Sequence, residues 1–238
     1  MRSWDPWRGC HKISEGCLNC YIHVGDLKRS ITTDAIIKTE QFDRPIRKNN
    51  KGTFLIPSNE MVYTCFRSDF LIEEADQWRA EAWQMMRERQ DLSFLFLTKR
   101  IERFQLVAPH DFSENFRHVH VGCSIENQQN ADRALSELVK LPIHHKLIIC
   151  QPMLGPIDLS EYLSGGIELV VVGGESGRNA RPLHHDWVLA IRDQCIKHRV
   201  SFELRQLGSI TIKDGKTYKI PKNQLFANAK KADLNVMF

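Results

Sequence analysis

Three cysteines near the N-terminus are the residues best suited to carry chemistry. The segment Gly9–Tyr21 reads GCHKISEGCLNCY, so Cys10, Cys17 and Cys20 have the spacing Cys-x6-Cys-x2-Cys. Cys17 and Cys20 are three residues apart, which places them on one face of a helical turn, where their sulfurs can converge. Three thiolates leave one position of a four-iron cluster open to a small molecule. The motif therefore predicts one metal site, with an iron–sulfur cluster as the leading interpretation.

Two other interpretations of the cysteine motif remain open. A structural zinc site would need a fourth ligand, for which His11 and His23 are the nearest candidates. The three cysteines can also be purely structural residues. A disulfide framework is disfavoured, because the chain has seven cysteines and lacks the apolar core of a secretory signal at its N-terminus.

Short apolar runs separated by amphipathic stretches must position this motif. We predict strands at 62–65, 94–97, 119–124, 146–150, 168–172 and 201–204, and a short one around Trp4–Trp7. Between the predicted strands at 62–65 and 94–97, residues 73–90 show a helical face of Ala75, Trp78, Ala82 and Met85. Strand, helix and strand in this rhythm indicate βαβ units and a mainly parallel sheet.

The predicted fold is therefore α/β, a partial (β/α) barrel of about six to seven parallel strands. We expect one domain over residues 1–238, with a polar insertion at about 31–60 that contains DRPIRKNNKG. In such folds, chemistry lies on the loops that follow the carboxyl ends of the strands. The cysteine motif follows the first predicted strand.

Polar residues follow several other predicted strands. Ser124 and Glu126 end the run VHVGCS, and Glu126 is placed to accept hydrogen bonds from a ribose, although the neighbouring Asn127 can equally cap a helix. Thr98, Lys99 and Arg100 end the run FLFL, where they can bind an anion or begin a helix.

The run LVVV is followed by a turn rich in glycine. Backbone amides in such a turn can cradle an anion, or the glycines can simply allow a tight turn. Arg178 and Arg181 beside it can meet a phosphate or a carboxylate. The candidate binding residues of this turn are Gly173, Gly174, Glu175 and Ser176.

Composition sets broad limits on function. Apolar residues make up 42% of the chain and charged residues 26%, which is ordinary for a globular protein. No run approaches the ~18 apolar residues of a membrane span, so we expect a cytoplasmic protein with no membrane partner. The net charge of +4 permits an anionic partner without requiring one.

The cysteine motif resembles that of an uncharacterised, phage-associated three-Cys-motif family considered radical-SAM-like. The resemblance continues in order along nearly the whole chain. Its landmarks are RSDF (67–70), FLTKRIERF (96–104), VGCSIENQ (121–128), PMLGPIDL (152–159), VVVGGESGRNARP (170–182) and WVLAIRDQC (187–195).

The resemblance implies a partial barrel, a [4Fe–4S] cluster and S-adenosylmethionine (SAM). By the same resemblance, Tyr21 packs near the adenine, and Ser68 and Asp69 hold the SAM ammonium group; a helix cap is the alternative for Asp69. Radical-SAM proteins usually have Cys-x3-Cys-x2-Cys, so this chain has three more residues in the first gap. It also carries Gln151 where relatives usually have glutamate.

The leading functional hypothesis is therefore a radical-SAM-type enzyme. Its substrate is unidentified, with nucleic acid or a nucleotide as the candidate suggested by the phage association. The alternative is a non-enzymatic module, stabilised by iron–sulfur or zinc, that binds a partner protein encoded nearby. A zinc-dependent nucleic-acid-processing protein is a third hypothesis, but the sequence offers no acidic and histidine set for it.

Overall fold

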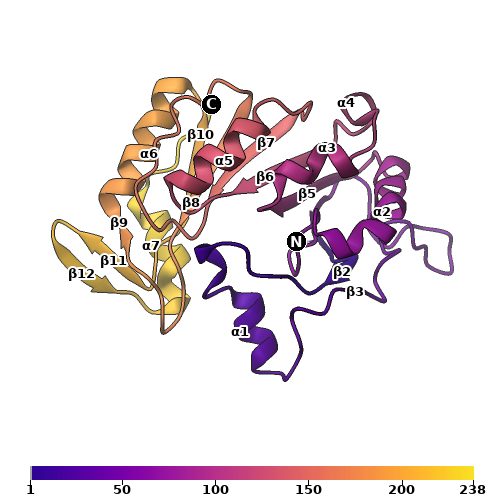
Figure 1. The fold of residues 1–238 in the computed structure, drawn as a ribbon, viewed down its shortest axis with the longest axis horizontal. Coiled ribbons are helices and arrows are strands. Elements are labelled where there is room, and N and C mark those ends of the chain that lie inside the picture. Colours follow the sequence, from indigo (N-terminus) through magenta and orange to yellow (C-terminus); the bar gives the residue numbers. More distant parts are fainter. Residues whose placement is uncertain (1) are drawn as a thin grey trace. The chain divides into compact units, whose positions relative to one another are not determined.

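A computed structural model describes residues 2–238 of the protein (Figure 1). Its main sheet has seven strands, all parallel, in the order β1-β4-β5-β6-β7-β8-β10. This confirms the predicted partial (β/α) barrel and the predicted number of strands. Every predicted apolar run coincides with one strand of this sheet: β1 Arg2–Trp4, β4 Met61–Thr64, β5 Ser93–Thr98, β6 Val119–Ser124, β7 His145–Cys150, β8 Ile167–Gly173 and β10 Ser201–Gln206.

The residues group into two compact units. The first comprises the chain up to Ile13 together with Tyr21–Gly122 and Leu141–His145. Besides its strands of the main sheet, it contains α1 Tyr21–Leu27, η2 Glu73–Ala75, α2 Asp76–Glu88, η3 Ile101–Arg103, α3 Phe104–Val107, α4 Phe112–Asn115 and the pair β2 Trp7–Arg8 and β3 Ile37–Lys38.

Aromatic side chains form the core of the first unit. Phe70 packs against Trp83 and Phe96, with ring centroids 4.9 and 4.7 Å apart. Trp83 in turn lies edge-on to Phe112 and Phe116. These large rings bury much apolar surface between α2 and the strands, and this burial is the main stabilising term for the unit.

Arg89 anchors the polar insertion to the end of α2. Its guanidinium is buried, donates hydrogen bonds to the carbonyls of Pro45 and Ile56, and lies over the ring of Phe54. The insertion is otherwise built from turns, with β3 as its short strand. Arg89 thus ties two separate parts of the insertion to the end of α2 through their backbone carbonyls.

The second unit comprises Ser14–Cys20, Cys123–Lys140 and Lys146–Phe238. Within it, α6 and α7 lie against β10, and a second sheet has the order β12-β11-β9 (Figure 1, left). Its remaining elements are η1 Glu15–Cys17, α5 Gln128–Leu138, β9 Leu183–His184, α6 His185–His198, β11 Ile210–Lys213, β12 Lys216–Lys219, η4 Lys222–Gln224 and α7 Leu225–Ala232.

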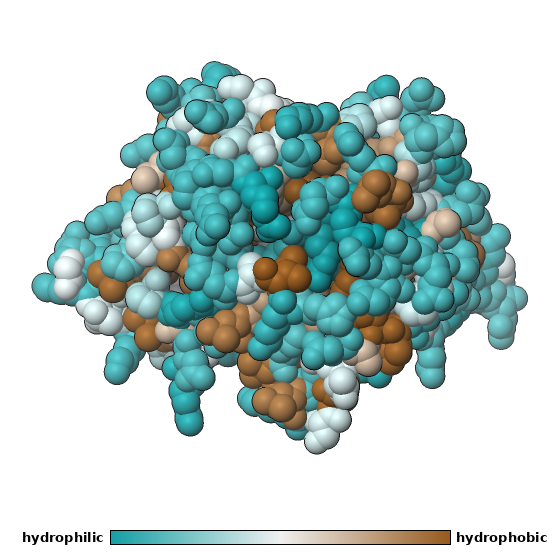
Figure 2. All heavy atoms as spheres, in the orientation of Figure 1, coloured by the Kyte–Doolittle hydropathy of each residue, from teal (hydrophilic) through white to brown (hydrophobic). Residues whose placement is uncertain are grey.

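The visible surface is largely hydrophilic, with isolated apolar residues between polar ones (Figure 2). No helix within residues 2–238 combines the length and the apolar character that crossing a membrane requires.

Candidate functional site

Cys10 belongs to the first unit and is positioned by Gly9. The backbone N–H of Cys10 donates to the carbonyl of Thr33 over 2.9 Å. Gly9 has φ +96°, and a Cβ at this position would lie 2.8 Å from the Thr33 oxygen and nearer still to that of Ala35. Only glycine fits this close approach of two backbone segments without strain.

The guanidinium of Arg100 lies beside Cys10. Arg100 is buried and pairs with Asp69 over 3.0 Å, and its second terminal nitrogen donates to the carbonyl of His11 over 3.4 Å. The Cys10 thiol donates to the same carbonyl over 3.5 Å. Burial alone would lower the pKa of Arg100, but Asp69 and a hydrogen bond with the Cys10 sulfur raise it. The first predicted cysteine ligand therefore lies next to a permanent positive charge.

The carboxylate of Asp69 connects several segments of the first unit through hydrogen bonds. This carboxylate is buried and accepts hydrogen bonds from the hydroxyl of Thr98 and the backbone N–H groups of Lys99 and Leu71, besides the Arg100 pair. The bond to Leu71 closes a turn. The alternative that Asp69 caps a helix from Leu71 is wrong, because η2 begins at Glu73 with Ile72 as its cap residue. These bonds join the ends of β4 and β5. The role of Asp69 in binding the SAM ammonium group stays a prediction.

Ser68 and Cys65 complete the surroundings of Cys10 in this unit. The Ser68 hydroxyl donates to the carbonyl of Gly9 and also hydrogen-bonds the Cys65 thiol. Cys65 is buried directly after β4, with a left-handed φ of +58°. Burial raises the pKa of Cys65 well above its usual value, and the nearby Asp5 and Asp69 carboxylates raise it further.

Cys17 and Cys20 belong to the second unit, on the segment Ser14–Cys20. The hydroxyl of Ser14 lies 3.6 Å from the Cys17 sulfur, and the N–H of Cys17 donates to the Ser14 carbonyl over 3.0 Å. The N–H of Cys20 donates to the carbonyl of Cys17 over 3.2 Å, so the two cysteines share one tight turn as predicted. We call Ser14–Cys20 the cysteine loop.

Glu126 holds the cysteine loop from the end of β6. Its side chain is buried and accepts a hydrogen bond from the backbone N–H of Gly16 over 3.0 Å. The neighbouring Asn127 donates to the carboxylate of Glu15 and, through its own oxygen, accepts from the N–H of Asn130 over 3.0 Å. Asn127 is therefore the cap of α5, which confirms that alternative.

Glu175 holds the same loop from the end of β8. Its carboxylate accepts from the amide of Asn19 over 3.0 Å and from the backbone and guanidinium of Arg181. Arg181 also donates to the carbonyl of Glu15 over 3.0 Å. Burial would raise the pKa of Glu175, but the bonds from Arg181 and Asn19 outweigh it and hold the pKa below its usual value. Nothing in the local sequence marked Asn19 as an anchor.

The glycine-rich turn is packed against backbone. A Cβ on Gly174 would lie 2.5 Å from the backbone nitrogen of Gly208, and the N–H of Gly174 donates to the carbonyl of Gln206 over 3.3 Å. The N–H of Gly177 donates to the Ser209 hydroxyl over 3.1 Å. The structure thus gives these glycines a packing role, as in the tight-turn alternative. Gly173 ends β8, and its Cβ would meet the side chain of Gln151.

The remaining predicted residues occupy less constrained positions. Tyr21 begins α1 with an exposed ring, and its hydroxyl donates to the carbonyl of Phe66 over 2.7 Å. Ser124 is the last residue of β6 and Ser176 follows β8; both are half-buried. His11, a candidate zinc ligand, bonds the carboxylate of Glu74 over 2.6 Å. Burial lowers the pKa of His23, the other candidate.

Both units carry surface depressions. In the second unit, a hollow of about 470 Å³ lies beside the cysteine loop and is lined by Ser14, Glu15, Asn127, Gln129, Asn130 and Arg133.

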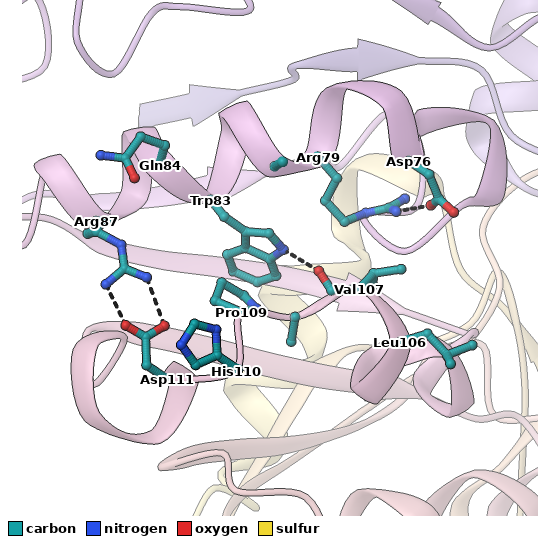
Figure 3. Close-up of a pocket in the computed structure, with 12 residues that line it drawn as sticks. Asp76, Arg79, Trp83, Gln84, Arg87, Leu106, Val107, Pro109, His110 and Asp111 are labelled. Atoms are coloured by element: carbon teal, nitrogen blue, oxygen red, sulfur yellow. Dashed lines mark hydrogen bonds and ion pairs between the residues drawn. The ribbon is translucent and has the colours of Figure 1, made fainter.

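In the first unit, a hollow of about 500 Å³ lies between α2 and the segment 106–111 (Figure 3). There Arg87 pairs with Asp111 through two bonds of 2.8 Å, and the Trp83 indole donates to Val107 over 2.8 Å. The hollow in the first unit contains none of the predicted site residues, and its charged side chains largely neutralise one another.

The fold and the anchored cysteines define an α/β protein with a partial barrel and a candidate metal-binding loop. The model of the family DUF5131, described as a protein of unknown function, matches residues 1–233, so the chain belongs to this family. Comparisons with curated proteins and with solved structures find no match.

Proposed function

We propose that the protein is a radical-SAM-type enzyme that holds a [4Fe–4S] cluster through Cys10, Cys17 and Cys20. The observation that carries the proposal is the anchoring of the cysteine motif to residues that follow strands of the parallel sheet. In the first unit these are Ser68 and Arg100, and in the second they are Glu126 and Glu175. Ligand-binding residues of partial and complete (β/α) barrels are concentrated on such loops.

The chemistry of the donor set fits a cluster. None of the seven cysteines, all within residues 2–238, forms a disulfide, so the three thiols remain available as ligands. Cys10 and Cys20 are partly accessible and Cys17 is buried with 9% of its surface exposed, whereas the other four cysteines are almost fully buried. These are Cys65 directly after β4, Cys123 in β6, Cys150 in β7 and Cys195 in α6. Soft thiolates are the ligands that iron–sulfur clusters use, and partial accessibility allows a cluster to be inserted.

When bound, the cluster would supply one electron for cleavage of SAM to methionine and a 5′-deoxyadenosyl radical that abstracts hydrogen from the substrate. The chain's own residues would position and tune the site. Arg100 donates toward Cys10, and Glu126 and Glu175 fix the cysteine loop. The ring of Tyr21 is exposed, as stacking on an adenine would require. The hollow beside Ser14 offers polar groups to a substrate, with a nucleotide as the candidate from the resemblance to phage-associated proteins.

Purification without oxygen tests this proposal. We expect a brown protein with about four irons per chain, which forms 5′-deoxyadenosine from SAM after reduction. A colourless protein with stoichiometric zinc contradicts the proposal and favours a structural metal site. A cluster that never cleaves SAM, with any nucleotide or nucleic acid added, contradicts the enzymatic part and favours the partner-binding module.

A pair of cysteine variants tests the ligand assignment. Cys17→Ala should lose iron, because two thiolates hold a cubane poorly. Cys195→Ala is the matched control. Cys195 is fully buried on the inner face of α6, where burial raises its pKa to about 12, so its replacement should leave the iron content unchanged. Equal iron content in the two variants would contradict the assignment.

A further inference from the structure

Positive charge is concentrated in the C-terminal part of the second unit. The segment Ile210–Ala232, which runs from β11 through α7, contains six lysines and one aspartate, a net charge of +5, whereas the whole chain has a net charge of +4. The rest of the protein is therefore almost neutral. All six lysines are exposed, and none forms an ion pair with an acidic group within residues 2–238.

Four of these lysines lie on and just after one β-hairpin. The strands β11 and β12 pair antiparallel around a turn formed by Asp214 and Gly215, both with positive φ. This is the two-residue turn that matches the natural twist of a hairpin. We call the hairpin, with the turn that follows it, the basic hairpin; its lysines are Lys213, Lys216, Lys219 and Lys222.

The basic hairpin is open to solvent. Its strand β12 is an edge of the three-stranded sheet, and all four of its residues are exposed, including Tyr218 with 46% of its surface accessible. The region of β12 in Figure 1 is largely hydrophilic in the matching view of Figure 2. Four cationic side chains and one aromatic ring are thus presented on one projecting element.

The register of the hairpin places like charges together. Lys213 is the direct partner of Lys216 at the closing pair. Like charges directly opposite each other on an antiparallel pair of strands are destabilising. A polyanion bound at this place would remove that repulsion.

We propose that the basic hairpin binds the phosphate backbone of nucleic acid. Nucleic acid carries one negative charge per ~1.7 Å of duplex, so spaced lysines find phosphates along it without a special fit. A two-stranded ribbon is narrow enough to enter a groove, and an exposed tyrosine can stack on an unpaired base. An anionic membrane fits less well, because β12 offers no aliphatic side chain to insert. The proposal goes beyond the cluster chemistry and does not depend on it.

The experiment measures fluorescence anisotropy of labelled single-stranded DNA, duplex DNA and RNA over a range of salt concentrations. For the unaltered protein we expect binding that weakens steeply with salt. In Lys216→Ala/Lys219→Ala, the slope of log affinity against log salt for duplex DNA should fall by about 1.8, since each lost contact removes ~0.9. The control Lys28→Ala/Lys51→Ala makes the same charge change at exposed sites of the first unit and should retain the slope.

Three outcomes would overturn the proposal. These are no binding to any of the oligonucleotides, an equal loss in both double variants, or binding to anionic phosphatidylserine vesicles without binding to nucleic acid. Iron content, measured on the same preparations, should be equal in all variants. A failure of cluster assembly is thereby distinguished from a failure of nucleic-acid binding.

Discussion

The backbone N–H of Gly16 donates to the buried carboxylate of Glu126 across 110 residues of sequence. This bond fixes the cysteine loop to the end of β6 and satisfies a buried amide that water does not reach.

Removing this acceptor should release the cysteine loop. We expect Glu126→Ala to cost about 1–3 kcal/mol in the free energy of unfolding, because it leaves a buried donor unpaired. Glu126→Gln retains one acceptor oxygen and should lose less. Urea unfolding gives the cost, and iron content after anaerobic purification shows whether the loop still binds. If both variants match the unaltered protein in stability and iron, the bond has no anchoring role.

Arg100 should set the reduction potential of the proposed cluster. A positive charge and a hydrogen bond at the Cys10 sulfur favour the reduced, more negative form. We therefore expect Arg100→Gln to lower the potential by about 60 mV, a tenfold change for a one-electron couple. Redox titration followed by electron paramagnetic resonance measures this shift.

Arg103→Gln serves as the control for Arg100, since it removes the same charge from the same unit. Arg103 pairs with Glu73 and Asp76. The reduction potential of the cluster in Arg103→Gln should stay near that in the unaltered protein. Equal shifts of the potential in the two variants would mean that Arg100 acts only through net charge.

A side chain at position 9 should lower the free energy of unfolding. Gly9→Ala should be destabilised by about 1–3 kcal/mol beyond the cost of its positive φ, because the new Cβ would collide with carbonyls of Thr33 and Ala35. Gly52→Ala is the matched control, since Gly52 has φ +77° with no atom near its would-be Cβ. Thermal unfolding compares the two, and equal losses would show that backbone conformation alone matters at Gly9.

Asp91 should contribute to stability at neutral pH and lose this contribution in acid. Its hydrogen bonds with Arg89 lower its pKa from 3.8 to about 2. Because the pKa is lower in the folded state, the stabilisation is complete above about pH 4 and is lost as the pH falls through 2. Urea unfolding should show Asp91→Asn less stable than the unaltered protein at pH 7, and the difference should shrink as the pH falls toward 2 and vanish below it. A difference that is independent of pH would contradict this origin.

The sequence predicted the sheet well because its strands are apolar on both faces. The consecutive residues Val171 and Val172 of β8 point to opposite faces and are both buried, and such runs stand out in any amino-acid pattern. The strand β12 was not predicted, because all four of its residues are polar or exposed and leave no apolar period. The face of α2 was predicted in part. Ala82 and Met85 are buried as expected, but Arg79 is buried too, since its guanidinium donates to the carbonyl of Phe70.

The candidate site could be placed from the sequence, but its bonding could not. Glu126 and Glu175 were predicted at strand ends, and both lie there. Their partners Gly16 and Asn19 lie 110 and 156 residues away, so no local pattern could reveal that they anchor the cysteine loop. Arg181 was predicted to meet an anion, and the structure pairs it with a carboxylate of its own chain.

Arg89 binds the polar insertion through the carbonyls of Pro45 and Ile56, and every amino acid has a carbonyl. A segment that is held through its backbone can change its amino acids during evolution, provided that its backbone conformation is retained. Related proteins should therefore retain the arginine while the sequence of the insertion drifts, and the loop is a natural place for members of the family to acquire differences from one another.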